Sequence, residues 1–454
     1  MSEVLDKATK ILNLCQEKGN FDAEVYLQAS KQYEILIDQN IISSQSVVQE
    51  HGCGLRIINN GQLGFSYSNS LEESNLERMI NQAISISSQS PLDEANNIPG
   101  LKGAIPMDIY SSEVANLNME DICDMGSLIL DGIKEDSRIN LILSTIKSNV
   151  TKVAIVNTNE VEESFKSTQL RYDIFGLARE GNKIGSYAFV QKVSRKTDIN
   201  PQDLLDEFIP KVLNGLNVQK LGEFKGSVIF KPVALGYPLG FMLIMSIEGN
   251  NVFHKRTQWR DKMGAEVAIP EFQVEDLPRN PEKPTSRPFD DEGVPTENRS
   301  IIENGILKTF LQTSYSAKKN EVEITGNAFR SLYPSQTSYT NPPRYALPIG
   351  MTIQSGEISY TEMIEDTKKG ILIGRYSGSG RYQTGEYSGV AKQAVLIEDG
   401  EIKYPLIGVM IAGNVFEDLR NITAISKEKD YTDEINFLET PYLTFEGISV
   451  SSEN

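Results

Sequence analysis

A cluster of prolines is the feature that most constrains the fold of this chain. Five of them fall within one short run, at Pro278, Pro281, Pro284, Pro288 and Pro295. Each proline fixes its φ angle and lacks a backbone N–H donor, so the run suits neither the interior of a helix nor a central strand. We therefore predict an irregular loop that crosses the surface of the molecule.

Three acidic residues lie side by side near the end of this loop, at Asp290, Asp291 and Glu292. Their carboxylates suit a hard cation such as Mg²⁺ or Ca²⁺, and they would also attract the amine of a peptide. The alternative is a solvated acidic turn that ends at Gly293. From the residues alone, both interpretations stay open.

The charge balance excludes some classes of partner. The chain has 454 residues, with 62 Asp and Glu against 44 Lys and Arg, which gives a formal net charge of −18. A protein that binds nucleic acid needs a basic stripe to displace counterions from phosphate, and no cluster of Lys and Arg supplies one. The same balance disfavours an anionic membrane surface. We therefore expect neither nucleic acid nor a membrane as partner.

Other features bear on the compartment. The longest apolar run, residues 233–247, is too short to span a bilayer and is broken by glycine and proline. The N-terminus shows no apolar signal segment. The three cysteines, Cys15, Cys53 and Cys123, are odd in number and far apart, which suits a reducing environment. These features predict a cytoplasmic protein.

Length and local signals predict three domains of the α+β class. Residues 1–100 and 101–221 read as α+β units whose sheets are mostly antiparallel, and residues 222–454 as a β-rich domain of hairpins. Apolar periodicity predicts helices over 3–18, 73–84, 118–135 and 203–216, the second of them after a capping box at 70–73. Alternation predicts separate strands at 23–27, 33–37, 54–58, 63–66, 141–148, 152–157, 167–178 and 185–193. Hairpin turns are predicted at Asn60-Gly61, Asn304-Gly305 and Asp399-Gly400.

Several segments resemble one known family. Residues 288–296, 302–307, 314–317 and 325–327 are similar to the C-terminal region of the TldD/PmbA family, whose members are linked to peptide cleavage. Residues 54–56 and 61–65 resemble its N-terminal domain, so the similarity is not confined to one end.

The resemblance implies where the chemistry of this family would lie. Its active members carry His-Glu-x-x-x-His, followed closely by Glu-Gly, and the histidines hold zinc while the glutamate acts as general base. When this chain is aligned on Glu248-Gly249, the ligand positions fall on Gly240 and Met245, and the base position on Phe241. None of these residues can bind zinc or act as a general base as the family's motif requires. The family's cysteine ligand near the C-terminus is also missing. We therefore expect no metal and no catalytic residue here, but an apolar core helix or buried strand.

A glycine-rich segment holds three tyrosines, Tyr376, Tyr382 and Tyr387. In the resembled family this region helps to form the floor of a peptide cleft, and the three rings could stack along a bound peptide. The alternative is a loop beside a strand where two backbones approach closely. The two histidines, His51 and His254, are expected at a strand edge and on the surface, respectively.

The resemblance implies a TldE/PmbA-type protein, the metal-free member of the family. Such a chain pairs with a TldD-type zinc subunit in the proteolysis or maturation of peptides, so a homodimer or heterodimer is expected, with zinc only in the partner. One alternative is a self-sufficient metal-dependent peptidase that uses the carboxylates of Asp290, Asp291 and Glu292. Another is a binding module, after the family's older label, modulator of DNA gyrase.

Overall fold

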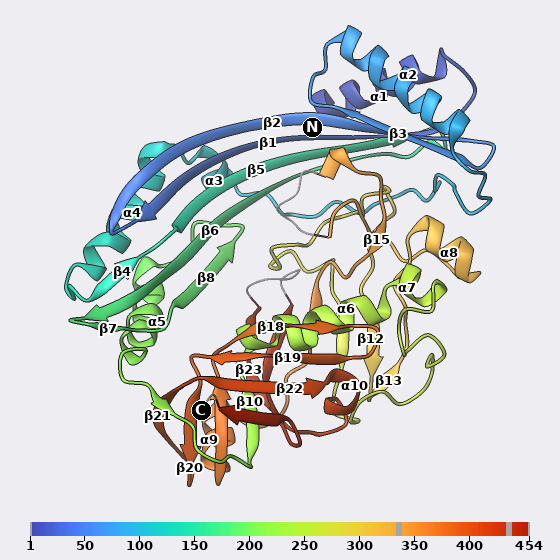
Figure 1. Ribbon diagram of the computed structural model, residues 1–454. Coiled ribbons are helices and arrows are strands. Elements are labelled where there is room, and N and C mark those ends of the chain that lie inside the picture. The colour runs from blue at the N-terminus through green and yellow to red at the C-terminus, as the bar shows by residue number, and fades with distance from the viewer. Residues whose placement is uncertain (1, 333–337, 433–437, 453–454) are drawn as a thin grey trace.

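The computed structural model describes residues 2–332, 338–432 and 438–452. A long curved sheet from the N-terminal half arches over a β-rich C-terminal region (Figure 1). Both halves combine helices with mostly antiparallel sheets, so the predicted α+β class is confirmed.

The N-terminal sheet has the strand order β3-β2-β1-β5-β6-β4, and β7 and β8 also pair with β6. Its pairings are all antiparallel. The strands are β1 Asp22–Asp38, β2 Ile41–Asn59, β3 Gln62–Ser68, β4 Ile139–Leu141, β5 Ser144–Asn157, β6 Glu162–Glu180, β7 Lys183–Ile184 and β8 Ala188–Ser194.

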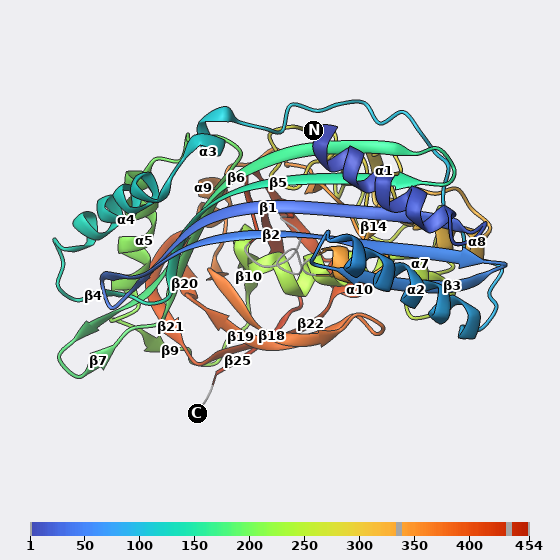
Figure 2. The same ribbon diagram turned by 90° about the horizontal axis from the view of Figure 1, so that it is seen from above.

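Two apolar cores lie on this single sheet, one at each end. Helices α1 (Ser2–Gln16) and α2 (Glu73–Gln89) cover one end, while α4 (Met119–Ile133) and α5 (Pro201–Asn214) pack at the other (Figure 2). Between them lies the short helix α3 (Ser112–Asn116). Both cores draw residues from each side of the predicted boundary near residue 100, since Ile35 and Ile37 belong to the core with α4 and α5, and Ala154 and Val156 to the core with α1 and α2. Strands β1 and β5 pair across the same position within one sheet.

Two strand predictions are wrong in their length. The segments 23–27 and 33–37 belong to one strand, β1. Residues 144–148 and 152–157 likewise belong to one strand, β5, whereas Leu141, at the start of the predicted segment 141–148, ends β4. The polar residues between them stay extended because each strand is hydrogen-bonded along its length to its neighbours. The capping box also fails, because α2 begins one residue after Glu72, whose side chain makes no capping hydrogen bond.

The described part of the C-terminal region forms three sheets. The largest has the order β13-β12-β11-β16-β24-β10-β17-β20-β21-β9, with β23 on β24; a second has the order β18-β19-β22-β25, and β14 pairs with β15. Their bounds are β9 Gln219–Lys220, β10 Ser227–Phe230, β11 Val274–Asp276, β12 Arg299–Glu303, β13 Ile306–Leu307, β14 Ala328–Phe329, β15 Tyr345–Ala346, β16 Met351–Ile353, β17 Lys369–Ile373, β18 Arg375–Arg381, β19 Glu386–Lys392, β20 Val395–Glu398, β21 Glu401–Ile407, β22 Val409–Asn414, β23 Ile422–Tyr431, β24 Glu439–Phe445 and β25 Ser449–Ser452.

A helical run packs into the main C-terminal core against these sheets. It consists of a 3₁₀ turn η1 (Pro232–Leu235), a π-helical turn η2 (Gly236–Phe241) and α6 (Met242–Ile247). The segment around 240–249, predicted as an apolar core helix or a buried strand, is thus helical over residues 240–247. The other helices are α7 Gly249–Phe253, α8 Ser314–Asn320, η3 Ser338–Thr340, α9 Tyr360–Glu365 and α10 Val415–Asp418.

The three predicted hairpin turns are confirmed. Both central residues of each turn have positive φ, as at Asn304 (51°) and Gly305 (73°), which is the geometry of a type I′ turn. Within the described residues, the model shows no helix of the length and apolarity that crossing a membrane requires.

Candidate functional site

The acidic loop is buried, contrary to the prediction of a surface crossing. Asp290, Asp291 and Glu292 are 1%, 3% and 1% exposed. The loop is irregular, as its prolines require, but it lies between the N-terminal sheet and the C-terminal sheets. The alternative of a solvated acidic turn is therefore wrong as well, because the distant Arg56 pairs with Glu292 and the nearby Arg287 pairs with Asp291.

Glu292 connects the two halves of the molecule. Its Oε1 accepts from Nη1 of Arg56 at 2.8 Å, and its Oε2 accepts from the backbone N–H of Ser314 at 2.8 Å. Nη2 of Arg56 donates to Glu24 at 2.7 Å, and Glu24 also pairs with the fully buried Arg330. The result is a chain of alternating charges between β1, β2 and the loop, in which every charge has a partner.

The carboxylates of Asp290 and Asp291 are also engaged by hydrogen bonds or ion pairs. Asp291 pairs with Arg287 at 2.7 Å and accepts from the backbone N–H of Arg330 at 2.8 Å. Asp290 accepts three backbone N–H groups, those of Glu292, Val294 and Ala328. Burial and the charge of Glu292 raise the pKa of Asp290 to about 8, while the backbone donors act in the opposite direction. These contacts hold the loop in place and leave little of the carboxylates for a cation or a peptide amine.

Gly240, Phe241 and Met245 lie together on the run from η2 to α6. Gly240 is buried, and a Cβ placed on it would come within 3.0 Å of the Leu438 side chain. The side chain of Met245 is almost entirely buried, at 8% exposure. Phe241 stacks on Tyr237, with ring centroids 5.1 Å apart and planes at 17°. The π-helical turn thus carries an aromatic stack. None of the positions 240, 241 and 245 has a polar side chain.

The three tyrosines of the glycine-rich segment differ in burial. Tyr376 and Tyr387 are 6% and 5% exposed and belong to the main C-terminal core, so they do not offer open faces to a peptide. Tyr387 donates its hydroxyl to Asp418 at 2.8 Å. Tyr382 is half-buried and meets Phe241 edge to face at 6.4 Å. Of the three stacking candidates, only Tyr382 keeps a partly accessible ring.

Glu248 and Gly249 have structural roles. Glu248 caps α7 by accepting the backbone N–H of Asn251 at 2.8 Å, and it also accepts from Ala346 at 3.2 Å. Burial raises the pKa of Glu248, and these two donors act against that rise. Gly249 has no room for a side chain, because a Cβ would lie 2.2 Å from Oε1 of Gln312. The dipeptide therefore fixes the junction between α6 and α7.

The described residues also line a cavity of about 410 Å³ between β2, α7 and α8. Arg56 and Asn250 belong to its wall, together with Asp93, Tyr315 and Arg344. Tyr315 donates its hydroxyl to Asp93 at 3.0 Å, and Lys319 pairs with Asp93 at 2.9 Å. No local pattern in the sequence indicates this cavity, since its residues come from segments up to about 290 positions apart. His51 and His254 are exposed and do not take part, as expected.

Comparison with known proteins settles the family. The family model described as PmbA/TldA metallopeptidase C-terminal domain matches residues 223–452, more than half of the chain. A second model, described as PmbA/TldA metallopeptidase domain 1, matches residues 23–87. The chain belongs to the PmbA/TldD metallopeptidase family.

The relatives extend over nearly the whole chain. It is 25% identical over 440 residues to a metalloprotease PmbA homolog of Buchnera aphidicola, covering 94% of each chain. It is 32% identical to metalloprotease PmbA of Escherichia coli over 220 residues, 48% of this chain and 44% of the relative. Among solved structures, TldE from Thermococcus kodakarensis shares the fold with a TM-score of 0.89 at 22% identity, covering 98% and 100% of the two chains. A putative modulator of DNA gyrase from Bacteroides thetaiotaomicron gives 0.87 at 22% identity, with 100% coverage of both.

The residues at the metal positions of the PmbA/TldD family do not fit zinc. Gly240 offers no donor, Phe241 offers no base, and a thioether such as that of Met245 is a poor zinc ligand. Nor do the residues that the structure describes include any group of three or more His, Cys, Asp or Glu that could hold a metal ion. We therefore derive no zinc-dependent step for this chain.

Proposed function

We propose that this protein is the non-catalytic, TldE/PmbA-type subunit that pairs with a TldD-type zinc peptidase in the proteolysis or maturation of peptides. The observation that carries the proposal is the aromatic stack of Phe241 on Tyr237, at the position where an active relative needs a carboxylate base. The ring of Phe241 is half-buried beside Tyr237 and Tyr382, so an ionised base in its place would lose part of its solvation. The subunit would thus complete and shape a shared peptide chamber.

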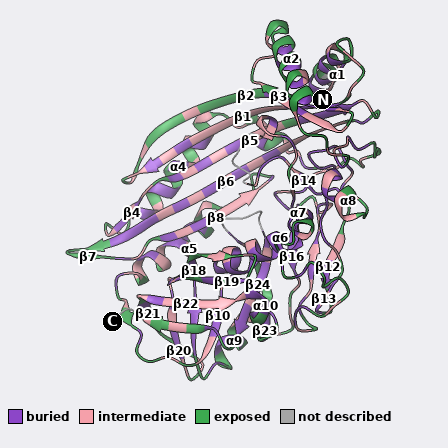
Figure 3. Ribbon diagram, turned by 45° about the vertical axis from the view of Figure 1, so that its right-hand side comes forward, coloured by how far each residue is buried: buried purple, intermediate pink, exposed green. Residues whose placement is uncertain are grey.

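Pairing needs a surface that can receive a partner, and β2 offers one. Its neighbour β3 covers only Cys53 to Asn59, so the first half of β2 is an open sheet edge in the described structure. Val47 and Val48 on this edge are 52% and 46% exposed, and Figure 3 shows exposed residues along much of β2. An unpaired edge with apolar side chains supports strand-to-strand association with a second subunit.

The same surface is available to a second copy of this chain. Our proposal therefore covers a homodimer when the protein is alone and a heterodimer when the zinc subunit is present. We place the pair in the cytoplasm, with peptides as its ligands. Nucleic acid is not proposed as a partner, because the net charge of −18 opposes contact with phosphates.

The decisive experiment mixes the purified protein with a TldD-type protein encoded by the same genome. We expect the two to co-elute in size-exclusion chromatography, with zinc in the partner alone, and peptide cleavage to exceed that of the partner alone. Absence of both co-elution and added cleavage would contradict the proposal. A stoichiometric metal in this chain by itself, linked to peptidase activity, would instead support the self-sufficient peptidase.

A further inference from the structure

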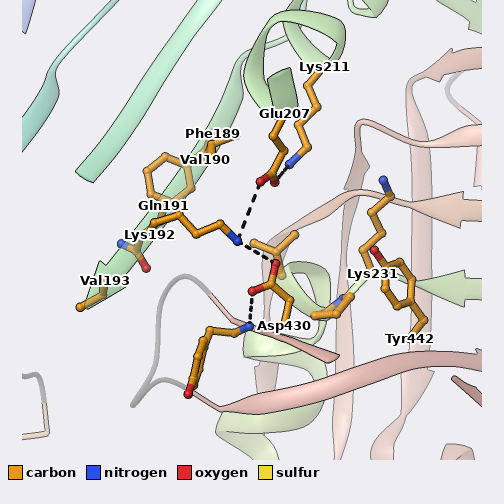
Figure 4. A pocket seen from close by; sticks show the side chains of 13 residues that line it. Phe189, Val190, Gln191, Lys192, Val193, Glu207, Lys211, Lys231, Asp430 and Tyr442 are labelled. Atoms are coloured by element: carbon orange, nitrogen blue, oxygen red, sulfur yellow. Dashed lines mark hydrogen bonds and ion pairs between the residues drawn. The ribbon is translucent and has the colours of Figure 1, made fainter. Parts of the chain in front are cut away.

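A second cavity, of about 480 Å³, opens between the two halves of the molecule, away from the positions of the family's zinc motif. Residues 189–193 of β8 and the helix α5 line it from the N-terminal half, and η1, β23 and β24 line it from the C-terminal half. Its volume lies in the range of roughly 300–1,000 Å³ that is usual for ligand sites. Figure 4 shows its side chains pointing into the shared space from both halves.

The charged residues in this cavity are paired, with one exception. Lys192 lies between Glu207 at 3.9 Å and Asp430 at 3.4 Å, and Lys211 pairs with Glu207 at 2.6 Å. Lys231 makes no ion pair and no side-chain hydrogen bond with any residue that the structure describes. Burial, and next the charge of Lys211, lower the pKa of Lys231, while the charge of Glu207 acts in the opposite direction.

Tyr442 provides a second donor beside this lysine (Figure 4). Its ring packs on Tyr360, with centroids 4.4 Å apart, which fixes its orientation. Its hydroxyl has no hydrogen-bond partner within the described ranges of the chain. One ammonium and one hydroxyl therefore line the cavity without a hydrogen-bond partner among the described residues, and such a pair matches an anionic oxygen acceptor.

The strand β8 adds a backbone surface to the same wall. It pairs with β6 along one edge, and no other described strand covers its second edge. Alternate residues of an edge strand turn their N–H and C=O groups away from the sheet, where they can pair with an extended chain. Five consecutive residues of β8 line the cavity, so its open edge runs along the wall.

We propose that this cavity binds the C-terminal end of an extended peptide, which adds as a strand to the open edge of β8 and places its terminal carboxylate against Lys231 and Tyr442. Charge decides the direction of the peptide. The two acids that could attract an amine, Glu207 and Asp430, are already paired with Lys192 and Lys211, whereas Lys231 forms no ion pair within the described residues. The biological role of the site rests on the proposed function, but the binding itself needs no partner subunit.

The test uses a fluorescently labelled Ala-Val-Thr-Val-Ala peptide in two forms, with a free C-terminal carboxylate and with a C-terminal amide. Fluorescence anisotropy with the full-length protein should show the acid binding at least about tenfold more tightly than the amide, because a charge-assisted contact is lost. A third peptide, N-methylated at alternate amides, should also bind at least about tenfold more weakly. Equal affinity of the acid and the amide would overturn the carboxylate site, and equal affinity of the methylated peptide would overturn strand addition.

Variants locate the site. Lys231→Met should abolish the preference for the acid, and Tyr442→Phe should reduce it while keeping the ring contact with Tyr360. Lys369→Met is the matched control, since Lys369 is exposed in the same half of the molecule, and it should bind like the wild type. An unchanged preference in a folded Lys231→Met protein would refute the assignment, and if that variant fails to fold, an unchanged preference in Tyr442→Phe would do so.

The result of the peptide-binding test is independent of the result of the pairing experiment. Loss of co-elution with a TldD-type partner would overturn the proposed function and leave the acid-versus-amide comparison intact. Loss of the acid preference, with co-elution retained, would overturn only the carboxylate site.

Discussion

Arg56 and Glu292 are 236 residues apart in the sequence, yet Nη1 of Arg56 donates to Oε1 of Glu292 across 2.8 Å. Arg56 comes from β2, and Glu292 from the loop beneath the sheet. Both side chains are buried, and Arg56 also holds Glu24. The pair therefore fixes how the N-terminal sheet sits on the C-terminal half, and it positions one wall of the cavity beside α7 and α8.

Replacing Arg56 with methionine should destabilise the protein strongly. The substitution keeps much of the side-chain volume but leaves Glu292 without its arginine and Glu24 with Arg330 alone. Breaking a buried ion pair from one side costs about 3–5 kcal/mol. We expect a fall of that size in the free energy of unfolding, measured by urea denaturation followed by circular dichroism.

The matched control for this variant is Arg260→Met. Arg260 pairs with Asp261 on the surface, with side chains 38% and 76% exposed. Exposed pairs contribute about 0–1 kcal/mol, so its loss should change stability little. Similar effects of the two substitutions would show that the buried chain of charges does not hold the halves together.

The sequence could not reveal this chain of charges. Asp290, Asp291 and Glu292 looked like a metal or peptide site because the nearest residues in sequence include only one cation, Arg287. The partners Arg56 and Arg330 come from other segments, and only the fold brings them to the loop. Burial of a charged loop depends on such distant partners, which local composition does not encode.

A pH effect is expected from Asp418. Burial raises its pKa from 3.8 to about 6, the hydroxyl of Tyr387 acts against this, and Glu417 adds to it. A carboxyl group whose pKa is higher in the folded state binds its proton more tightly there. Its stabilising contribution is therefore complete below about pH 4 and is lost as the pH rises through about 6.

Asp418→Asn should remove this dependence while keeping an acceptor for Tyr387. Relative to the wild type, the variant should gain up to about 3 kcal/mol of stability between pH 4 and pH 7, since one pKa unit corresponds to about 1.4 kcal/mol. Urea denaturation of both proteins at the two pH values measures the difference. A difference that stays constant with pH would show that Asp418 does not titrate in this window.

Gly249 tests whether the Glu-Gly dipeptide is structural. A methyl group at this position would meet Gln312 at 2.2 Å and the backbone oxygen of Leu311 at 2.6 Å. Gly249→Ala should therefore lower stability by about 1–3 kcal/mol through overpacking. Gly222→Ala is its control, because nothing lies within 4 Å of a Cβ there. If thermal denaturation shows the same stability for both variants, the junction of α6 and α7 tolerates a side chain after all.

The sequence predicted helices such as α1 and α4 and the hairpin turns well, because residues close together in the chain determine these elements. The apolar periodicity of α1 and α4 and the Asn-Gly and Asp-Gly turns specify these elements within a few residues. The continuous strands β1 and β5 were divided in the prediction because their middle residues are polar, and only pairing with neighbouring strands keeps them extended. Tyr376 and Tyr387 were likewise predicted to stack along a bound peptide or to lie in a loop beside a strand, whereas β18 and β19 pair there and bury both rings.

The open edge of β2 gives a prediction for subunit pairing. Val47 is 52% exposed on the part of β2 that β3 does not cover, so Val47→Lys should leave the stability of the single chain within about 0.5 kcal/mol. A lysine on an edge strand opposes the addition of another strand. Co-elution with the TldD-type partner should therefore weaken at least about tenfold in apparent affinity. The control is Val322→Lys, at an equally exposed valine (53%) away from this edge, and this variant should pair with the partner like the wild type. Full retention of pairing in Val47→Lys would exclude this edge as the contact.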